Sequence, residues 1–497
     1  MQVLLLHLPL SRRSYLARFS LVEPMGQLYL GPALSPRHRV RLVDLRVTPD
    51  LDRELGDFSP EAAVVGVSPL TVTACGRALT ALRHRFPGIK ILLVADAEYG
   101  NSHLGERPHD FVQPLADALV TTHFLAPMIR VVRETLAAWE EGIPLHSVPG
   151  LLRQAVPGSW SATEAVPDRV GDIGVLDRKF LGHARGKYRF GGIGRMAHLF
   201  YTHGCRFRCR FCPMSKHDGS MVARRLDDVI AELVAMEEPN VYLQDYEPFL
   251  LPEAMERLAD RVEREGIRKN WYMMTRSDTA VQQELLIRRW KGLGLRWLYL
   301  GLDGFSVDRL REIRKGNSPE ANEEGLKRML ALDLGVSVGF VVRPDFSRED
   351  FRALHAYVRR LRAPFVTFTV ETPLVGTKLY DDTRDALTTH DWSLFDLEHA
   401  VLPTAIPLDA FYREMAKLQF RSGIRTLPAM LRHFPLRDTL RIWAQGPRAL
   451  RDLRRSAHDH ETPAGGVPAR PGGSGGSGGS GGPGPSARER LELRQPA

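Results

Sequence analysis

The chain has 497 residues, with 68 Lys and Arg against 59 Asp and Glu, and a formal net charge of +9. Its 43% apolar and 26% charged content is that of an ordinary globular protein, which excludes a disordered or collagen-like chain. At roughly 100–200 residues per domain, the length predicts two or three domains. Four cysteines in so long a chain exclude a disulfide framework.

The amino terminus carries no convincing targeting segment. The short apolar run at residues 3–6 has no basic residues before it and predicts a buried strand rather than a signal peptide. No apolar run approaches the roughly 18 residues of a membrane span. We therefore expect a cytoplasmic protein.

Residues 1–150 predict a doubly wound α/β domain, similar to a Rossmann fold. Apolar runs predict strands at 3–6, 40–45, 63–67 and 89–94, and a helix is expected at 72–85. Continuous apolar strands separated by helices are typical of a parallel sheet covered on both faces. Ligands of such sheets bind beyond the carboxyl ends of the strands, where this chain has His7, Asp44, Ser68 and Asp96. No G-x-G-x-x-G follows the first strand, so a dinucleotide site has no support.

A second α/β series is predicted after a Gly- and Pro-rich connector at residues 151–192. Within residues 193–385, strands are expected at 198–202, 241–244, 271–275, 297–302, 336–342 and 365–370. Most of these strands are followed by a helical stretch and a polar cluster. Six such units predict a partial barrel whose chemistry lies at the carboxyl ends of its strands.

The carboxyl-terminal part is expected to be a helical region, residues 386–456, followed by a flexible Gly/Ser/Pro-rich tail, residues 457–497. Residues 431–455 hold seven Arg against two Asp, with leucines and Trp443 interleaved. Two interpretations stay open: a helical cap with solvated arginines, or a surface that lies peripherally on an anionic membrane. Pro435 and the Gly446-Pro447 pair are expected to break this stretch into short helices.

The strongest motif is a C-x3-C-x2-C run, formed by Cys205, Cys209 and Cys212 after the first strand of the second series. Thiolates are the ligands of iron–sulfur clusters, and a [4Fe–4S] cluster normally takes four. Three thiolates leave one iron open, which can chelate the amino and carboxylate groups of S-adenosylmethionine (SAM). Electron transfer into the sulfonium then yields a 5′-deoxyadenosyl radical. The spacing resembles that of the radical SAM superfamily, with Phe211 at its usual aromatic position.

A zinc site of Cys3His type is the alternative, with His203 or His217 as the fourth ligand. Zinc sites usually pair two short ligand motifs, and the second motif is missing here. The remaining Cys75 lies in an apolar helical stretch and is expected to be a buried thiol.

Later motifs supply candidate cofactor contacts. Gln244, Asp245 and Glu247 lie where the superfamily has a loop that approaches the amino group of SAM. Arg276 and Asp278 are candidates for its carboxylate and ribose, and a structural ion pair is the alternative for each. Asp303 belongs to the 301–304 turn, where glycines allow close approach of the backbone to a ligand.

Over residues 1–445 the sequence resembles cobalamin (B12)-binding-domain radical SAM C-methyltransferases, and most of all the hopanoid C-3 methylase subgroup. The resemblance is carried by GIRK at 266–269, RSDT at 276–279, GLD at 301–303, TPLVGT at 372–377 and LFDLEHAVLPT at 394–404.

This resemblance implies three cofactors: a [4Fe–4S] cluster, SAM and cobalamin. One SAM methylates cobalamin, and a second yields the radical that takes hydrogen from an unactivated carbon, which then receives the methyl group. The substrate would be a small hydrophobic molecule, hopanoid-like or another natural product. The electron would come from a reductant such as ferredoxin or flavodoxin.

Two turns depart from the family pattern. Residues 95–98 are Ala-Asp-Ala-Glu where the family usually has Gly-Gly, and residues 121–124 are Thr-Thr-His-Phe in place of a Gly-Glu-Gly-Glu type turn. Side chains there are expected to obstruct the corrin tail and weaken cobalamin binding. The alternative function is therefore a radical SAM cyclase, oxidase or rearrangement enzyme without cobalamin. A nucleic-acid partner is not expected, since a second cysteine triad and any RNA-binding signature are missing.

Overall fold

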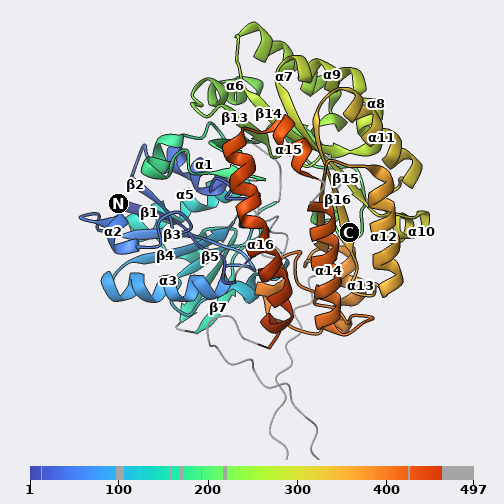
Figure 1. The fold of residues 1–497 in the computed structure, drawn as a ribbon. Coiled ribbons are helices and arrows are strands. Elements are labelled where there is room, and N and C mark those ends of the chain that lie inside the picture. The colour runs from blue at the N-terminus through green and yellow to red at the C-terminus, as the bar shows by residue number, and fades with distance from the viewer. Residues whose placement is uncertain are drawn as a thin grey trace, which may run out of the picture.

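A computed structural model describes residues 1–12, 14–96, 106–122, 124–156, 158–167, 172–191, 193–216, 221–423 and 426–461. Two α/β lobes lie side by side, and the long helix α16 (Leu436–Asp459) crosses the front between them (Figure 1). No helix among these residues is long and apolar enough to cross a membrane.

The amino-terminal lobe is built on a seven-stranded sheet with the order β2-β1-β3-β4-β5-β6-β7. Its parallel strands are β1 (Gln2–His7), β2 (Arg39–Asp44), β3 (Ala62–Val67), β4 (Lys90–Ala95) and β5 (Ala118–Val120). The order 2-1-3-4-5 is that of a doubly wound sheet, whose ligand crevice lies beyond the carboxyl ends of β1 and β3. The predicted fold class is confirmed.

Helices cover both faces of this sheet because successive strand residues point to opposite sides. Val3 and Leu5 pack with α1 (Met25–Leu34) and α5 (Leu125–Glu141). Leu4 and Leu6 pack on the other face with α2 (Leu51–Leu55) and α3 (Val72–Arg85). Cys75 on α3 is fully buried, as expected.

The predicted connector is wrong for residues 151–162. This segment forms β6 (Leu151–Val156) and β7 (Ser159–Ala162), which extend the amino-terminal sheet in antiparallel fashion from β5. Only Leu151 and Leu152 of these two edge strands enter the core, one on each face of the sheet. The other residues of the two strands lack the apolar pattern of a buried strand, so the sequence of this segment resembled that of a loop.

The second lobe is a six-stranded parallel sheet with the order β10-β13-β14-β15-β16-β17. Its strands are β10 (Met196–Leu199), β13 (Asn240–Leu243), β14 (Asn270–Arg276), β15 (Leu295–Asp303), β16 (Gly335–Val342) and β17 (Phe365–Val370). The helices that follow them are α6 (Leu226–Val234), α7 (Pro252–Arg264), α8 (Ser277–Gln282), α9 (Glu284–Gly292), α10 (Val307–Glu312), α11 (Pro319–Ala331), α12 (Arg348–Leu361) and α13 (Lys378–Thr383). The predicted partial barrel, with all six strands, is confirmed.

Short ladders connect the lobes and lead into the barrel. They are β8 (Arg189–Phe190) with β9 (Ile193–Gly194), and β11 (Thr202–His203) with β12 (Val222–Ala223). The second ladder follows β10 directly, so it sets the direction in which the cysteine loop leaves the sheet.

The carboxyl-terminal region is only partly helical. Its helices are α14 (Leu408–Gly423), α15 (Leu427–His433) and α16, whereas residues 387–407 are mainly loop with one short 3-10 turn, contrary to the expected helical region. Pro435 separates α15 from α16 as expected, but Pro447 lies inside α16 without ending it. Burial of Ala449 and Leu453 offsets the hydrogen bond that this proline removes.

Candidate active site

The three cysteines of the motif lie in the loop that follows β10 and β11. Neighbouring segments fix this loop through the backbone of Arg210, whose N–H donates to Ile313 O and whose carbonyl accepts from Leu379, both at 2.9 Å. Cys209 is buried, and Cys205 and Cys212 are half-buried. The loop therefore holds its thiols at the carboxyl end of the barrel, where parallel barrels carry their chemistry.

Two buried cations lie beside these thiols. Arg276, at the end of β14, has Nη1 4.0 Å from Sγ of Cys209, and its guanidinium lies 3.7 Å from the centre of the Phe207 ring. Burial raises the pKa of all three thiols, that of Cys212 to about 12, while the charges of Lys315 and Arg276 oppose this rise for Cys209. Metal coordination would hold these thiols as thiolates. The soft donors and nearby positive charge fit an anionic iron–sulfur cluster.

Arg276 and Asp278 form an ion pair with each other, as the structural alternative for these two residues predicted. Nε donates to Oδ1 at 2.9 Å and Nη2 to Oδ2 at 2.7 Å, and Nη2 also donates to the carbonyl of Lys315 at 2.7 Å. This pair fixes the guanidinium beside Cys209. It leaves the Asp278 carboxylate partly exposed at the same edge.

Asp245 and Glu247 are both buried and both bind the protein itself. Asp245 accepts the backbone N–H groups of Tyr201 at 2.9 Å and Thr202 at 2.6 Å, and the Thr202 hydroxyl at 2.7 Å. Glu247 accepts the N–H of Arg276 at 2.8 Å and the hydroxyl of Thr275. Burial raises the pKa of each carboxyl to about 7. Their geometry is that of residues which position the cysteine loop and Arg276.

Gln244 differs from its two acidic neighbours. Its backbone N–H donates to Leu199 O at 2.9 Å, which continues the sheet. Its side-chain Oε1 is buried and accepts no hydrogen bond from the described residues. Since a buried amide oxygen without a donor is costly, this atom fits the amino group of a ligand such as SAM.

Asp303 lies at the end of β15 with a φ of +62°, and Lys315 Nζ is 2.5 Å from its Oδ2. Burial lowers the pKa of Lys315, but the Asp303 carboxylate outweighs this and raises it, so the lysine is a buried cation. Lys315 belongs to no motif in the sequence, so its role at this site was not predicted. The pairing depends on the left-handed backbone at Asp303 and on the approach of the turn after α10. Phe211 is half-buried next to Cys212.

The carboxyl edges of the two sheets face one another. Phe124, after β5, has its ring centre 5.4 Å from that of His203, which precedes the cysteine motif. Nη1 of Arg107, after β4, donates to the Tyr380 hydroxyl at 2.9 Å. Nη2 of Arg12, after β1, donates to the Asp391 carboxylate at 2.6 Å. Three loops of the amino-terminal edge thus meet β11, α13 and the loop that contains Asp391, at the cysteine end of the barrel.

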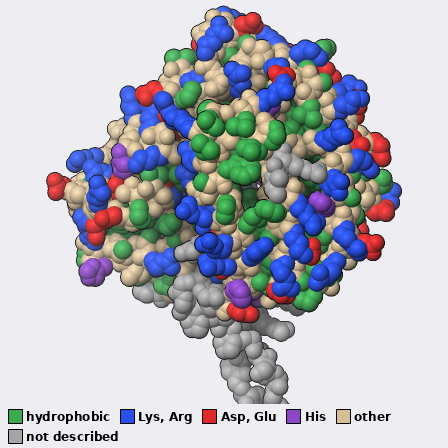
Figure 2. Space-filling view, viewed as in Figure 1, with side chains coloured by type: hydrophobic (Ala, Val, Ile, Leu, Met, Phe, Trp, Pro, Cys, Tyr) green, Lys and Arg blue, Asp and Glu red, His purple; other side chains and the backbone are tan. Residues whose placement is uncertain are grey.

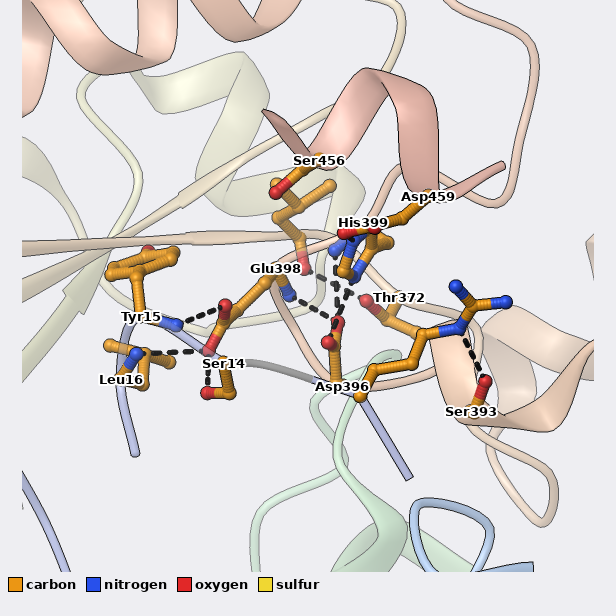
Figure 3. Close-up of polar contacts among 12 residues, drawn as sticks. Ser14, Tyr15, Leu16, Thr372, Ser393, Asp396, Glu398, His399, Ser456 and Asp459 are labelled. Atoms are coloured by element: carbon orange, nitrogen blue, oxygen red, sulfur yellow. Dashed lines mark hydrogen bonds and ion pairs between the residues drawn. The ribbon is translucent and has the colours of Figure 1, made fainter. Parts of the chain in front are cut away.

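The segment 394–404 joins these two edges (Figure 3). Glu398 accepts the N–H of Tyr15 at 2.9 Å, the N–H of Leu16 at 3.0 Å and the hydroxyl of Ser14. Its carboxylate therefore fastens the loop after β1 to the barrel. The neighbouring His399 is buried between two carboxylates, Asp396 and Asp459.

Polar residues at the carboxyl ends of the amino-terminal strands are engaged within the domain. His7 Nε2 and Asp96 Oδ2 lie 3.6 Å apart, and both residues are buried. Asp44 pairs with Arg46 at 2.8 Å. Ser68 lies in the turn to α3, where its N–H donates to Thr71 Oγ1 at 2.9 Å.

The two turns that depart from the family pattern lie partly outside the described residues, which exclude Ala97, Glu98 and His123. The Thr121 hydroxyl donates to Gly150 O at 3.1 Å, and Thr122 is buried. Asp96 is also buried, 3.6 Å from His7, so all three side chains contact the amino-terminal domain itself, and the expected weakening of cobalamin binding stays a prediction.

A zinc site would need the three cysteines and a histidine gathered around one ion. Among the described residues, no three His, Cys, Asp or Glu side chains are grouped to hold one metal ion. His217 lies outside the described residues.

Comparison with known proteins agrees with this geometry. Residues 199–358 match the radical SAM superfamily. The chain is 27% identical over 414 residues to the hopanoid C-3 methylase of Methylococcus capsulatus, which covers 82% of this chain and 77% of that protein. It is 26% identical over 392 residues to an uncharacterized methyltransferase of Pyrococcus horikoshii, and the match covers 74% of this chain and 80% of that protein.

Two solved structures share the architecture of both lobes. OxsB, a cobalamin-dependent SAM radical enzyme solved with aqua-cobalamin and SAM bound, has a TM-score of 0.66 at 12% identity, with 91% of this chain and 71% of that chain covered. The radical SAM methyltransferase TsrM from Kitasatospora setae, solved with cobalamin and a [4Fe–4S] cluster, has a TM-score of 0.61 at 14% identity, with 92% and 100% covered. Residues 199–358 therefore carry a radical SAM domain, and the chain as a whole is similar to hopanoid C-3 methylase and shares the two-domain fold of OxsB and TsrM.

Proposed function

We propose that the protein is a radical SAM C-methyltransferase that uses a [4Fe–4S] cluster, SAM and cobalamin. The observation that carries this proposal is that the carboxyl edges of the two sheets face each other. The cysteine triad lies at the edge of the barrel, and the ligand crevice beyond β1 and β3 lies at the edge of the amino-terminal sheet. A methyl carrier on one edge and a radical source on the other could then reach one substrate between them.

The chain's own residues would hold these groups. Cys205, Cys209 and Cys212 would ligate three irons, and the Oε1 atom of Gln244 would accept from the amino group of SAM. Arg276 and Lys315 would stabilise the negative charge of the thiolates. When bound, the cluster supplies the electron that cleaves SAM, and cobalamin supplies the methyl group.

The amino-terminal sheet has the strand order 2-1-3-4-5, and sheets of this order bind a ligand beyond the carboxyl ends of β1 and β3. A corrinoid bound to the amino-terminal lobe would lie at this edge, which faces the cysteine end of the barrel. This placement, and the cobalamin in the structures of OxsB and TsrM, support cobalamin use over the alternative of a radical SAM cyclase, oxidase or rearrangement enzyme without it.

The substrate we propose is a small hydrophobic molecule with an unactivated carbon, hopanoid-like or another natural product. The named activity of the Methylococcus relative supports this class. A ferredoxin or flavodoxin would be the reductant in a reducing, cytoplasmic compartment, since the thiols of the triad must stay reduced before the cluster forms.

Anaerobic reconstitution with iron and sulfide tests the radical chemistry. We expect about four irons per chain, an EPR signal on reduction, and 5′-deoxyadenosine from SAM. Cys209→Ala should lose the signal and the product, while Cys75→Ala, at the buried cysteine of α3, should keep both. Failure of the wild-type protein to form 5′-deoxyadenosine under strong reductant would exclude the proposal.

Loading with hydroxocobalamin separates the two candidate functions. A methyltransferase should retain about one cobalamin per chain through gel filtration and should transfer a labelled methyl group from SAM to cob(I)alamin. Formation of 5′-deoxyadenosine by a protein that retains no cobalamin would support the cobalamin-free alternative.

A further inference from the structure

The outward face of α16 carries an apolar stripe that no described residue covers. Leu436, Leu440 and Trp443 have exposed fractions of 62%, 61% and 42%, and Leu431 on the adjoining α15 is 52% exposed. The spacing i, i+4 and i+7 puts the three α16 residues on one side of the helix. Large apolar side chains rarely gather on the surface of a soluble protein unless they contact a partner.

Basic residues continue the same face toward the carboxyl end of α16. Figure 2 shows apolar side chains over the upper half of the helix and Lys and Arg around them and below. Arg448, Arg451, Arg454 and Arg455 are exposed, and none of them forms an ion pair with a described residue. This half of the face therefore has positive charge available for a partner.

The acidic residues of α16 do not neutralise this face. Asp438 is buried, Asp452 pairs with Arg18 on the protein side, and Asp459 pairs with His399 at 3.2 Å. An exposed surface that is apolar at one end and cationic at the other matches the headgroup region of a bilayer with anionic lipids.

We propose that α15 and α16 form a docking face for an anionic lipid bilayer. The leucines and Trp443 enter the boundary between headgroups and acyl chains, and the arginines bind lipid phosphates, so the helix lies in the plane of the surface. An RNA partner would use the arginines but leaves the apolar stripe without a role. Docking itself does not depend on the proposed reaction.

Co-sedimentation of the full chain with vesicles tests this face without any cofactor. We expect binding to phosphatidylcholine vesicles that contain 30% phosphatidylserine, and much weaker binding to phosphatidylcholine alone. Replacing Arg451, Arg454 and Arg455 together with Gln should lower the partition coefficient by about 100-fold, roughly fivefold per charge. Replacing Leu436, Leu440 and Trp443 together with Gln should lower it at least tenfold. The changed side chains are largely exposed, so thermal melting should verify that all variants stay folded.

A matched control removes three exposed charges elsewhere, with Arg311→Gln, Lys327→Gln and Arg359→Gln on α10, α11 and α12. This variant should bind vesicles within about threefold of the wild-type protein, because it loses charge but keeps the face. Absence of wild-type binding, or equal losses in the control and the α16 arginine variant, would overturn the proposal. A dimer that dissociates when the leucines are replaced, without vesicle binding, would assign the face to a second copy and also overturn it.

Discussion

The Nη1 atom of Arg276 lies 4.0 Å from the Sγ atom of Cys209, and the protein fixes this approach from both ends of the arginine. Glu247 accepts the backbone N–H of Arg276 at 2.8 Å, and Asp278 holds the guanidinium through two hydrogen bonds. The cation is therefore in position before any ligand binds. Because the side chain is already ordered, the free energy of ordering it is not subtracted from the binding of the cofactor.

Arg276→Gln should make the reduction potential of the reconstituted cluster more negative by roughly 60 mV, a factor of ten in a one-electron equilibrium. The reason is that a positive charge beside a cluster ligand stabilises the reduced, more negative state. An EPR-monitored redox titration measures the shift. Arg276→Lys retains the charge and should stay close to the wild-type potential, whereas an unchanged potential in Arg276→Gln would contradict the assignment.

Asp245→Asn should destabilise the fold by about 1–3 kcal/mol at pH 5, because both oxygens of the carboxyl group accept a backbone N–H, from Tyr201 and Thr202, and the NH2 group of an amide cannot. The pKa of Asp245 is raised from 3.8 to about 7, so the folded protein keeps a proton that the unfolded chain releases. The contribution of this carboxyl to the unfolding free energy therefore falls as pH rises from 3.8 to 7.

Urea unfolding at pH 5 and pH 8 checks this sign. The difference in unfolding free energy between the wild-type protein and Asp245→Asn should be smaller at pH 8. Asp308→Asn, at an exposed site on α10, should match the wild-type protein at both values. An equal difference at pH 5 and pH 8 would show that Asp245 is already ionised in the fold at pH 5.

The sequence predicted the elements whose pattern is local. The helix at 72–85 and the strand at 365–370 agree in both bounds with α3 and β17, because helical periodicity and buried parallel strands leave clear apolar patterns. The edge strands β6 and β7 were missed because only two of their residues enter the core. Pro447 was expected to end a helix, and tertiary packing of α16 prevented this.

The sequence was enough to name most residues of the candidate site, but not to say which of them contact each other. Spacing alone identified the cysteine triad, and the ends of the strands identified Asp245 and Glu247. That both carboxylates bind backbone N–H groups depends on how neighbouring strands meet, which no local pattern encodes. Lys315 could not be predicted, since it reaches Asp303 only through the fold.

His399→Gln should destabilise the protein by about 3–5 kcal/mol below pH 6.5, because it leaves Asp396 and Asp459 without their shared cation. Burial lowers the pKa of His399, but the carboxylates outweigh it and raise the pKa to about 10. Its stabilising effect is therefore complete below pH 6.5 and is lost as pH rises through 10.

Denaturant unfolding between pH 6 and pH 10 measures this dependence. The gap in unfolding free energy between the wild-type protein and His399→Gln should narrow steadily over that range. The exposed His458, on the same helix as Asp459, supplies the control His458→Gln, which should stay within about 0.5 kcal/mol of the wild-type protein. A constant gap would mean that His399 is neutral in the fold.

Gly339→Ala should displace Tyr299 from the interior of the barrel. A Cβ atom at Gly339, on β16, would lie 1.7 Å from the Tyr299 hydroxyl oxygen on the neighbouring β15, so one of the two side chains must move. Overpacking of this kind costs about 1–3 kcal/mol, which thermal or urea unfolding measures.

A double-mutant cycle shows whether Tyr299 causes that loss. In a Tyr299→Leu background the clash is relieved, so Gly339→Ala should lower the unfolding free energy by less than about 1 kcal/mol. The difference between this loss and the loss in the wild-type background is the coupling energy of the two residues, which is of the size found for residues in contact. Gly292→Ala, on α9, has open space around the added methyl group and should be neutral or stabilising. If the losses from Gly339→Ala and Tyr299→Leu simply add, the loss at Gly339 does not come from contact with Tyr299.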